Sequence, residues 1–279
     1  MFQDVAIDRV RSFWDDRPCN IRHSPEPVGS RRYFEQVTER KYLVEPHIPR
    51  FAQFDRWRGK RVLEIGCGIG TDTMEFAQAG AEVTAVDLSR QSLDVARQRA
   101  EVFGVQDRVT FYEANAESLS DVVPPGAYDL IYSFGVIHHT PSPEAVIKQV
   151  REHFVGPGSE LKVMVYHRWA YKVFAILLAQ AAREGGGAFW RLDELVARSS
   201  EAQSGCPVTY TYSPRTGAAL LEGFEVTDWF VDHIFPYSIP EYVRYEYKKA
   251  WPFRYLPPWL MRALERSLGW HLCLTARVA

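Results

Sequence analysis

The segment of residues 62–73, VLEIGCGIGTDT, limits the fold of this chain more than any other part of the sequence. A short apolar run leads through three glycines, Gly66, Gly68 and Gly70, into a helical pattern that begins at Thr71. Glycine permits a positive φ and lets a ligand approach the backbone closely. The helix N-terminus adds unpaired N–H groups that suit a carboxylate or a phosphate. The segment therefore predicts a strand, a tight loop and a helix around a nucleotide-type ligand.

Strands and helices alternate through residues 59–167. Strands are expected at residues 61–65, 82–87, 109–113, 129–134 and 161–166, and helices at residues 71–79, 89–103 and 143–154. Ser89 has the side chain of a good N-cap for the second of these helices. Strands that are separated by helices form parallel βαβ units, so the sequence predicts an α/β fold with an open, doubly wound sheet.

Two acidic residues accompany the glycine loop. Glu64 lies just before Gly66, and Asp87 closes the next strand, where a carboxylate can accept both ribose hydroxyls of an adenosine. The glycine spacing is G-x-G-x-G, whereas the dinucleotide fingerprint is G-x-G-x-x-G, and Thr71 occupies the third glycine position. The spacing weakens an NAD interpretation, although Asp87 alone fits any adenosine ligand.

Five motifs in order make residues 60–167 resemble the class I S-adenosylmethionine-dependent methyltransferases. Glu64 with the three glycines matches the first motif, and Asp87 with Leu88 and Ser89 matches the ribose-binding end of the second strand. The other three matches are Asn115-Ala116-Glu117 after the third strand, residues 128–139 (YDLIYSFGVIHH) around the fourth strand, and Gly156-Pro157-Gly158 before the fifth. Asn115 departs from the Asp-Ala-Glu that this family often carries against the adenine.

The resemblance implies a Rossmann-like, mostly parallel seven-stranded sheet with an antiparallel last strand. Residues 225–235 and 270–278 are then the sixth and seventh strands. It also implies an enzyme that uses S-adenosylmethionine, with Glu64 orienting the loop and the cofactor's amino group. The cofactor contacts are expected from Glu64, Gly66, Cys67, Gly68, Gly70, Asp87, Leu88, Asn115, Ala116, Glu117, Ser133 and His138.

Four residues at the carboxyl ends of the fourth and fifth strands are candidates for catalysis: His138, His139, Tyr166 and His167. Methyl transfer is an in-line displacement whose rate depends on positioning, and a general base is needed only if the acceptor loses a proton. Histidine titrates near neutral pH and can serve as that base. In similar proteins a histidine at the position of His138 lines the methionine end of the cofactor, which is the alternative role.

No metal site is expected, because no acid or further histidine lies near His138 and His139 in the sequence. Three other histidines, His47, His233 and His271, are interpreted as surface or core residues.

The chain divides into three predicted regions. Residues 1–58 are expected to form a helical lid, in which Phe13, Trp14, Tyr33 and Tyr42 are candidates to close over the cofactor, and Tyr33 is counted with the cofactor-binding residues. Residues 59–167 form the S-adenosylmethionine-binding core. Residues 168–279 hold the last two strands and an insert rich in aromatic residues, which either walls the acceptor pocket or forms a hydrophobic cap.

The composition limits the kinds of partner and compartment that are expected for this chain. The formal net charge is −2 and the sequence pI is about 6.5, which weighs against nucleic acid. No apolar run reaches the ~20 residues that span a bilayer, no signal peptide is evident, and the four cysteines show no metal or redox spacing, so a cytoplasmic protein is expected. The sequence therefore predicts methylation of a small metabolite or natural product. An NAD-dependent oxidoreductase and a non-catalytic nucleoside-binding protein remain as alternatives, and the oligomeric state stays open.

Overall fold

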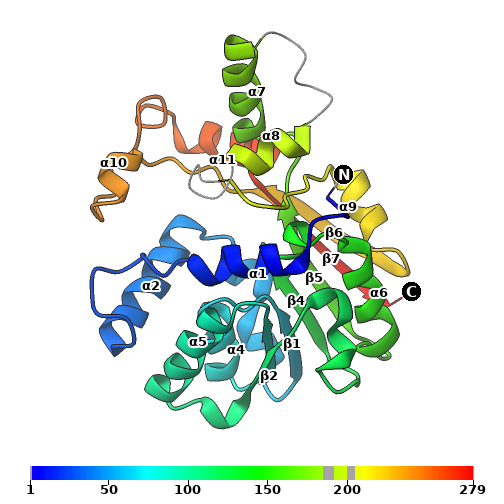
Figure 1. Ribbon diagram of the computed structural model, residues 1–279. Helices are drawn as coiled ribbons and strands as arrows, with labels where there is room; N and C mark the ends of the chain where they lie inside the picture. The colour runs from blue at the N-terminus through cyan, green and yellow to red at the C-terminus, as the bar shows by residue number, and fades with distance from the viewer. Residues whose placement is uncertain (1, 185–191, 200–204, 279) are drawn as a thin grey trace.

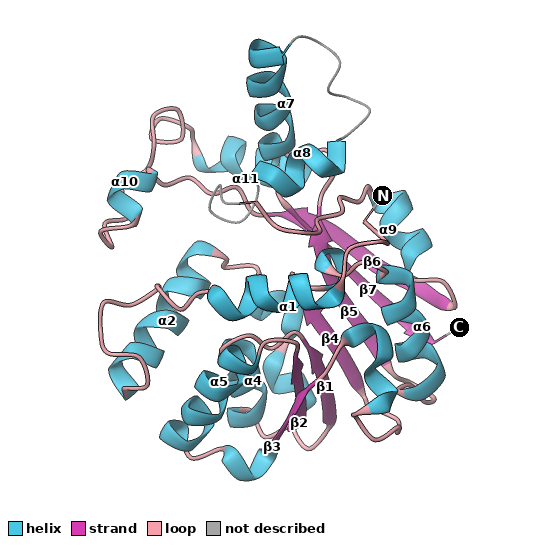
Figure 2. Ribbon diagram, viewed as in Figure 1, coloured by secondary structure: helices cyan, strands magenta, loops and turns pink. Residues whose placement is uncertain are grey.

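The computed structural model describes residues 2–184, 192–199 and 205–278, and one seven-stranded sheet forms its centre (Figures 1 and 2). The strand order is β3-β2-β1-β4-β5-β7-β6. The strands are β1 (Arg61–Ile65), β2 (Glu82–Asp87), β3 (Val109–Glu113), β4 (Leu130–Phe134), β5 (Glu160–Tyr166), β6 (Phe224–Asp232) and β7 (His271–Val278).

The sheet is parallel except for β7, which runs antiparallel to both β5 and β6. The predicted fold class, with its mostly parallel sheet and reversed last strand, is confirmed. Strand β1 lies between β2 and β4, so the order of the strands reverses beside it. In a doubly wound sheet, ligands bind at the carboxyl ends of the strands at such a reversal.

Helices cover both faces of the sheet. Helices α4 (Thr71–Gln78) and α5 (Arg90–Phe103) pack on one face, and α6 (Pro143–His153) and α9 (Pro214–Leu220) on the other. The remaining helices are α1 (Ile7–Asp16), α2 (Arg31–Val44), α3 (Ile48–Ala52), α7 (Tyr171–Glu184), α8 (Leu192–Ser199), α10 (Ile239–Tyr242) and α11 (Pro258–Leu268).

Local sequence signals explain where several helices begin and end. Ser89 caps α5 as predicted, because its side chain accepts a hydrogen bond from the Ser92 N–H. Gly104 ends the same helix with a φ of +70°, a conformation that glycine adopts without strain. Ser213 and Thr216 form a capping box at the start of α9.

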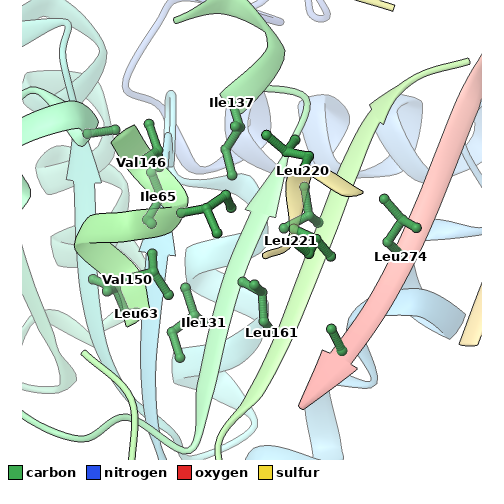
Figure 3. Close-up of a cluster of buried hydrophobic side chains, with 14 of the residues drawn as sticks. Leu63, Ile65, Ile131, Ile137, Val146, Val150, Leu161, Leu220, Leu221 and Leu274 are labelled. Carbon is green, nitrogen blue, oxygen red and sulfur yellow. The ribbon is translucent and has the colours of Figure 1, made fainter. Parts of the chain in front are cut away.

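Two hydrophobic clusters hold the sheet between its helices. One joins β1, β4 and β5 to α6 and α9, and Figure 3 shows the side chains that meet there, among them Leu63, Ile131 and Val150. The other joins the opposite face to α4 and α5 through residues such as Phe76 and Leu93. The burial of both faces accounts for the nearly continuous apolar composition of the central strands.

The N-terminal helices lie close to the carboxyl edge of the sheet, where α1 crosses it (Figure 1). Helix α2 packs against the glycine loop, because its side chains Tyr33, Phe34 and Val37 form a small buried cluster with Ile69 of that loop. The fully buried Arg99 of α5 donates hydrogen bonds to the Phe34 carbonyl and to the Thr71 hydroxyl, so it links α2 to the start of α4.

The segment between β5 and β7 adds helices beyond the carboxyl edge of the sheet (Figure 2). Part of it binds α2: the Arg40 guanidinium lies 3.8 Å from the centre of the Tyr242 ring and donates a 2.6 Å hydrogen bond to the Tyr242 carbonyl. Within the described residues, no helix combines the length and the apolar character that a bilayer crossing needs. The division into three regions remains a prediction.

Replacement of Ile131 by alanine tests the cluster shown in Figure 3. Ile131 is fully buried on β4, so we expect Ile131→Ala to lower the free energy of unfolding by about 2–5 kcal/mol through lost burial and the cavity that remains. Urea denaturation followed by circular dichroism gives this value. Val122→Ala is the control, because Val122 is 46% exposed and should change stability little. Equal effects of the two substitutions would contradict this description of the core.

Candidate functional site

A pocket opens at the carboxyl ends of the central strands, where the strand order reverses. Its wall combines the loop after β1, the ends of β2, β4 and β5, the segment after β3, and one side of α1. The lining residues include Val10, Trp14, Glu45, Gly66, Cys67, Gly68, Asp87, Leu88, Asn115, Ala116, Phe134, His139, Met164, Tyr166 and His271.

The glycine loop needs its glycines for two different reasons. Gly66, Gly68 and Gly70 have φ values of +80°, +53° and +75°, a region that other residues adopt with strain. A Cβ on Gly66 would lie 2.1 Å from the Val136 side chain, so packing excludes a larger residue there. A Cβ on Gly68 would meet no atom within 4 Å, and Gly68 lines the pocket. The backbone at Gly68 is therefore open to a ligand.

Asp87 fixes this loop against the end of β2. Its two carboxylate oxygens accept hydrogen bonds from the Gly68 N–H and the Ser89 N–H, both at 2.8 Å. Burial raises the pKa of Asp87, and the hydrogen bonds that its carboxylate accepts from backbone N–H groups oppose that rise. The carboxylate lines the pocket beside Leu88, which is the place predicted for a ribose-binding acid.

Behind the loop lies a buried polar cluster. Glu64 accepts a 2.5 Å hydrogen bond from the Thr73 hydroxyl. Asp72 accepts hydrogen bonds from Lys41 Nζ at 2.7 Å, from the Tyr42 hydroxyl at 2.9 Å and from the Tyr132 hydroxyl at 3.0 Å. Burial and the neighbouring charge of Asp72 raise the pKa of Glu64 to about 8. The contacts of Asp72 with Lys41 and Tyr42 join α2 to α4 next to the glycine loop.

The segment after β3 contributes Asn115 and Ala116 to the pocket wall. Asn115 Oδ1 accepts a 3.1 Å hydrogen bond from the Glu117 N–H, which starts a short 3-10 turn. Glu117 lies outside the wall, because its carboxylate accepts a 2.7 Å hydrogen bond from the Ser142 N–H. The side-chain oxygen of Asn115, a residue expected to contact the cofactor, thus already has a backbone partner.

The two adjacent histidines differ in position. His139 lines the pocket, and its Nδ1 lies 2.8 Å from the Val208 carbonyl oxygen. A carbonyl only accepts, so Nδ1 carries the proton and Nε2 is the proton acceptor of the neutral ring. His138 is fully buried behind the wall, where burial lowers its pKa well below the usual range. Its ring packs 4.0 Å from that of Tyr166, measured between centroids.

Tyr166 lines the pocket at the end of β5, whereas His167 does not. His167 follows the strand, and its Nδ1 lies 3.2 Å from the Gly269 carbonyl oxygen. Of the four candidates for catalysis, the structure therefore brings His139 and Tyr166 to the pocket. Their roles remain predictions.

Several predicted cofactor residues support the pocket without lining it. The Ser133 hydroxyl donates to the Ile65 carbonyl at 3.1 Å, and Gly70 precedes the first turn of α4. Tyr33 is fully buried and its hydroxyl donates to the Ile21 carbonyl at 2.7 Å. The predicted residues outside the wall are Tyr33, Glu64, Gly70, Glu117, Ser133, His138 and His167.

Of the four aromatic residues considered for the lid, Trp14 lines the pocket. Tyr42 instead binds Asp72, and Phe13 packs edge-on against Trp14 with the ring centroids 5.1 Å apart. Among the described residues of the aromatic insert, none lines this pocket. Trp251 is instead 79% exposed. Sequence reasoning also missed Val10 and Met164, which line the pocket and showed no signal beyond an apolar side chain.

Comparisons with known proteins agree with this geometry. Residues 62–158 match the family model described as "Methyltransferase domain". A ubiquinone biosynthesis O-methyltransferase from Aromatoleum aromaticum is 32% identical over 155 residues, which are 54% of this chain and 64% of that protein. The chain thus spans less than two thirds of this relative's length.

Two solved structures share the fold across nearly the whole chain. Magnesium protoporphyrin IX methyltransferase from Synechocystis, with bound S-adenosylhomocysteine, has a TM-score of 0.59 and 16% identity, and the match covers 98% of this chain and 100% of that one. The (4+2)-cyclase SpnF has a TM-score of 0.56 and 19% identity, with 96% and 94% covered. At these identities the structures establish the fold, and together with the family model they confirm the resemblance seen in the sequence.

The raised pKa of Glu64 makes stability depend on pH in a defined direction. Between 4.5, its ordinary value, and about 8, the folded protein holds a proton that the unfolded chain releases. The free energy of unfolding should therefore fall as pH rises through this window. We expect Glu64→Gln to flatten this decline in the protein without ligand, measured by urea denaturation at several pH values between 5 and 8.

Glu113→Gln is the matched control, because Glu113 is an exposed carboxylate at the end of β3. It should leave the decline as in the unmodified protein. A Glu64→Gln protein whose stability still falls as steeply over the same window would contradict the assignment.

Proposed function

Since the chain belongs to the class I S-adenosylmethionine-dependent methyltransferases, we propose that it transfers the methyl group of this cofactor to a small molecule. The observation that carries the proposal is the pairing of Asp87 with the open backbone of Gly68 at the same pocket. The carboxylate offers acceptors for a sugar diol, the uncovered Gly68 lets a ligand approach closely, and the N-terminus of α4 behind the loop favours an anionic tail.

The residues of the pocket fit the cofactor part by part. Asp87 would hold the ribose, and Asn115 and Ala116 would border the adenine. The loop from Gly66 to Gly68, with the N-terminus of α4 behind it, would receive the carboxylate of the methionine part. When bound, the cofactor supplies an electrophilic methyl carbon, and the chain supplies alignment and the exclusion of water.

The acceptor that these walls suit is small and largely apolar. Val10, Trp14, Phe134, Met164 and Tyr166 contribute apolar or aromatic surface to the pocket. Such a lining with a few polar groups is typical of sites for small molecules. The net charge of −2 supports a small molecule over a nucleic acid.

A hydroxyl is the acceptor group that the site supports best. The related proteins named ubiquinone biosynthesis O-methyltransferases methylate oxygen by name. The tautomer of His139 leaves Nε2 as its proton acceptor, and His139 would take the proton of a phenolic hydroxyl as the oxygen attacks the methyl carbon. We infer that His139 is the general base and that His138 supports the ring of Tyr166 from behind.

No disulfide joins the cysteines of the described residues. This supports a reducing compartment, and we propose the cytoplasm.

The fold also admits a different reaction, because the matching SpnF structure is named a cyclase. Binding of S-adenosylmethionine without transfer of its methyl group to any acceptor would favour this different reaction. Binding of NAD in place of S-adenosylmethionine would favour an oxidoreductase. Calorimetric titration of the unmodified protein with NAD identifies the second of these outcomes, and a labelled methyl group that stays on the cofactor identifies the first.

Asp87→Ala tests the cofactor site. We expect the variant to bind S-adenosylmethionine roughly 10- to 150-fold more weakly in isothermal titration calorimetry, since hydrogen bonds to a charged group contribute about 1.5–3 kcal/mol. Asp94→Ala, which removes a 62% exposed carboxylate from α5, should bind like the unmodified protein. The proposal fails if Asp87→Ala retains full affinity or if the unmodified protein ignores the cofactor.

His139→Ala tests the general base. With S-adenosylmethionine carrying a labelled methyl group and a set of simple phenols and catechols as acceptors, we expect kcat to fall about 100- to 10,000-fold while cofactor binding stays. His153→Ala on α6 is the control, because His153 lies outside the pocket wall. Unchanged kcat in His139→Ala would remove this residue as the base, and an unmodified protein that methylates none of these compounds would exclude this acceptor class.

A further inference from the structure

Three histidine rings from distant parts of the chain meet beside the pocket. His47 lies between α2 and α3, His233 follows β6, and His271 begins β7. One nitrogen of each ring lies within 4.8 Å of the corresponding nitrogens of the other two. Among the described residues, no second group of three histidine, cysteine or acidic side chains gathers in this way.

The spacing of the nitrogens suits coordination. His47 Nε2 and His271 Nδ1 are 3.0 Å apart. Two imidazole nitrogens bound to one metal ion at about 2.1 Å lie about 3.0 Å apart at a right angle and about 3.4 Å apart at a tetrahedral angle. The His233 nitrogen lies at most 4.8 Å from the other two. A tetrahedral spacing therefore requires it to move by about 1.4 Å or less, which a rotation of its side chain can supply.

The outer sides of two rings have the partners that metal-binding histidines use. His271 Nε2 lies 3.6 Å from the Glu45 carboxylate, and the His233 ring forms a hydrogen bond with the backbone of Val44. Such contacts to a carboxylate or a backbone carbonyl fix the tautomer, so that the other nitrogen can bind a metal. His47 Nδ1 is buried and has no hydrogen-bond partner within the described chain.

Two of the three rings, those of His47 and His271, are buried, and that of His233 is partly buried. Burial lowers the pKa of His47 and of His233 to about 3, and lowers that of His271 well below its usual range, so all three rings are neutral. Neutral imidazole is the form that binds metal ions. His233 also has a φ of +74°, an uncommon conformation for a residue with a side chain, and such strain concentrates at functional sites.

We propose that His47, His233 and His271 bind one divalent first-row transition metal ion, such as Zn²⁺ or Fe²⁺. Three imidazole ligands suit these ions and leave coordination positions open. His271 and Glu45 also line the cofactor pocket, so the ion would lie at its edge on the β7 side. If the proposed methyl transfer is correct, an acceptor hydroxyl bound to the ion would have a lowered pKa. The metal site itself does not depend on that reaction.

Metal binding can be tested directly on the full chain, purified without a histidine tag and treated with EDTA. We expect titration with Co²⁺ to produce visible absorption bands that saturate at one ion per chain, and Zn²⁺ to remove them. His233→Ala and His271→Ala should each weaken binding at least about 100-fold, and Glu45→Gln about 10- to 100-fold. His153→Ala is the control and should titrate like the unmodified protein.

Two further measurements keep the test independent of folding and of the proposed function. X-ray absorption of the zinc-loaded unmodified protein should count three imidazole ligands. Circular dichroism reports whether each variant still folds, and calorimetry with S-adenosylmethionine is a second check for His233→Ala, because His233 lies outside the pocket wall. Absence of Co²⁺ and Zn²⁺ binding, fewer than two imidazole ligands, or full binding by folded His233→Ala and His271→Ala proteins would overturn the proposal. The three rings would then form a hydrogen-bonded group without a metal.

Discussion

The hydrogen bond from the Gly68 N–H to the Asp87 carboxylate is the contact on which the rest of the site depends. It joins the loop after β1 to the end of β2, the two strands that flank the ligand position. The loop can follow this path because Gly66, Gly68 and Gly70 all adopt positive φ values, and because Val136 fills the space that a side chain on Gly66 would need. The same contact leaves the backbone open toward the pocket, so the interaction that stabilises the loop also prepares it for a ligand.

A second layer of polar contacts connects this loop to the N-terminal helices. Asp72, in the first turn of α4, holds Lys41 and Tyr42 of α2, while Glu64 lies beside it with a raised pKa. Buried charges of this kind add little net stability, because desolvation offsets their attraction, but loss of one partner is expensive. Lys41 and Tyr42 thus tie α2 to the first turn of α4. Helix α1 then places Val10 and Trp14 on the pocket wall.

Histidines gather at the carboxyl edge of the sheet in two groups. His139 presents one nitrogen whose protonation state is set by the Val208 carbonyl. The cluster of His47, His233 and His271 lies at the edge formed by β7, with His271 shared between the cluster and the pocket wall. The reversal of strand order at β1 and the antiparallel course of β7 bring both groups to the carboxyl edge of the parallel strands. The topology thus gathers the proposed general base and the proposed metal site around a single opening.

The sequence by itself determined the strands and helices of the core, the glycine loop and the acid at Asp87, because these follow from local periodicity and from spacing within one strand–loop–helix unit. Strand bounds agreed to within a residue or two in the core, and the last two strands followed from the family resemblance. Only the tertiary structure decided which of two adjacent side chains faces the pocket, as for His139 over His138 and Tyr166 over His167. It also decided that Trp14 and not Tyr33 reaches the wall, and that three histidines far apart in the chain share one interior space. Those outcomes depend on the packing of segments that are distant in sequence, and no local sequence pattern predicts that packing.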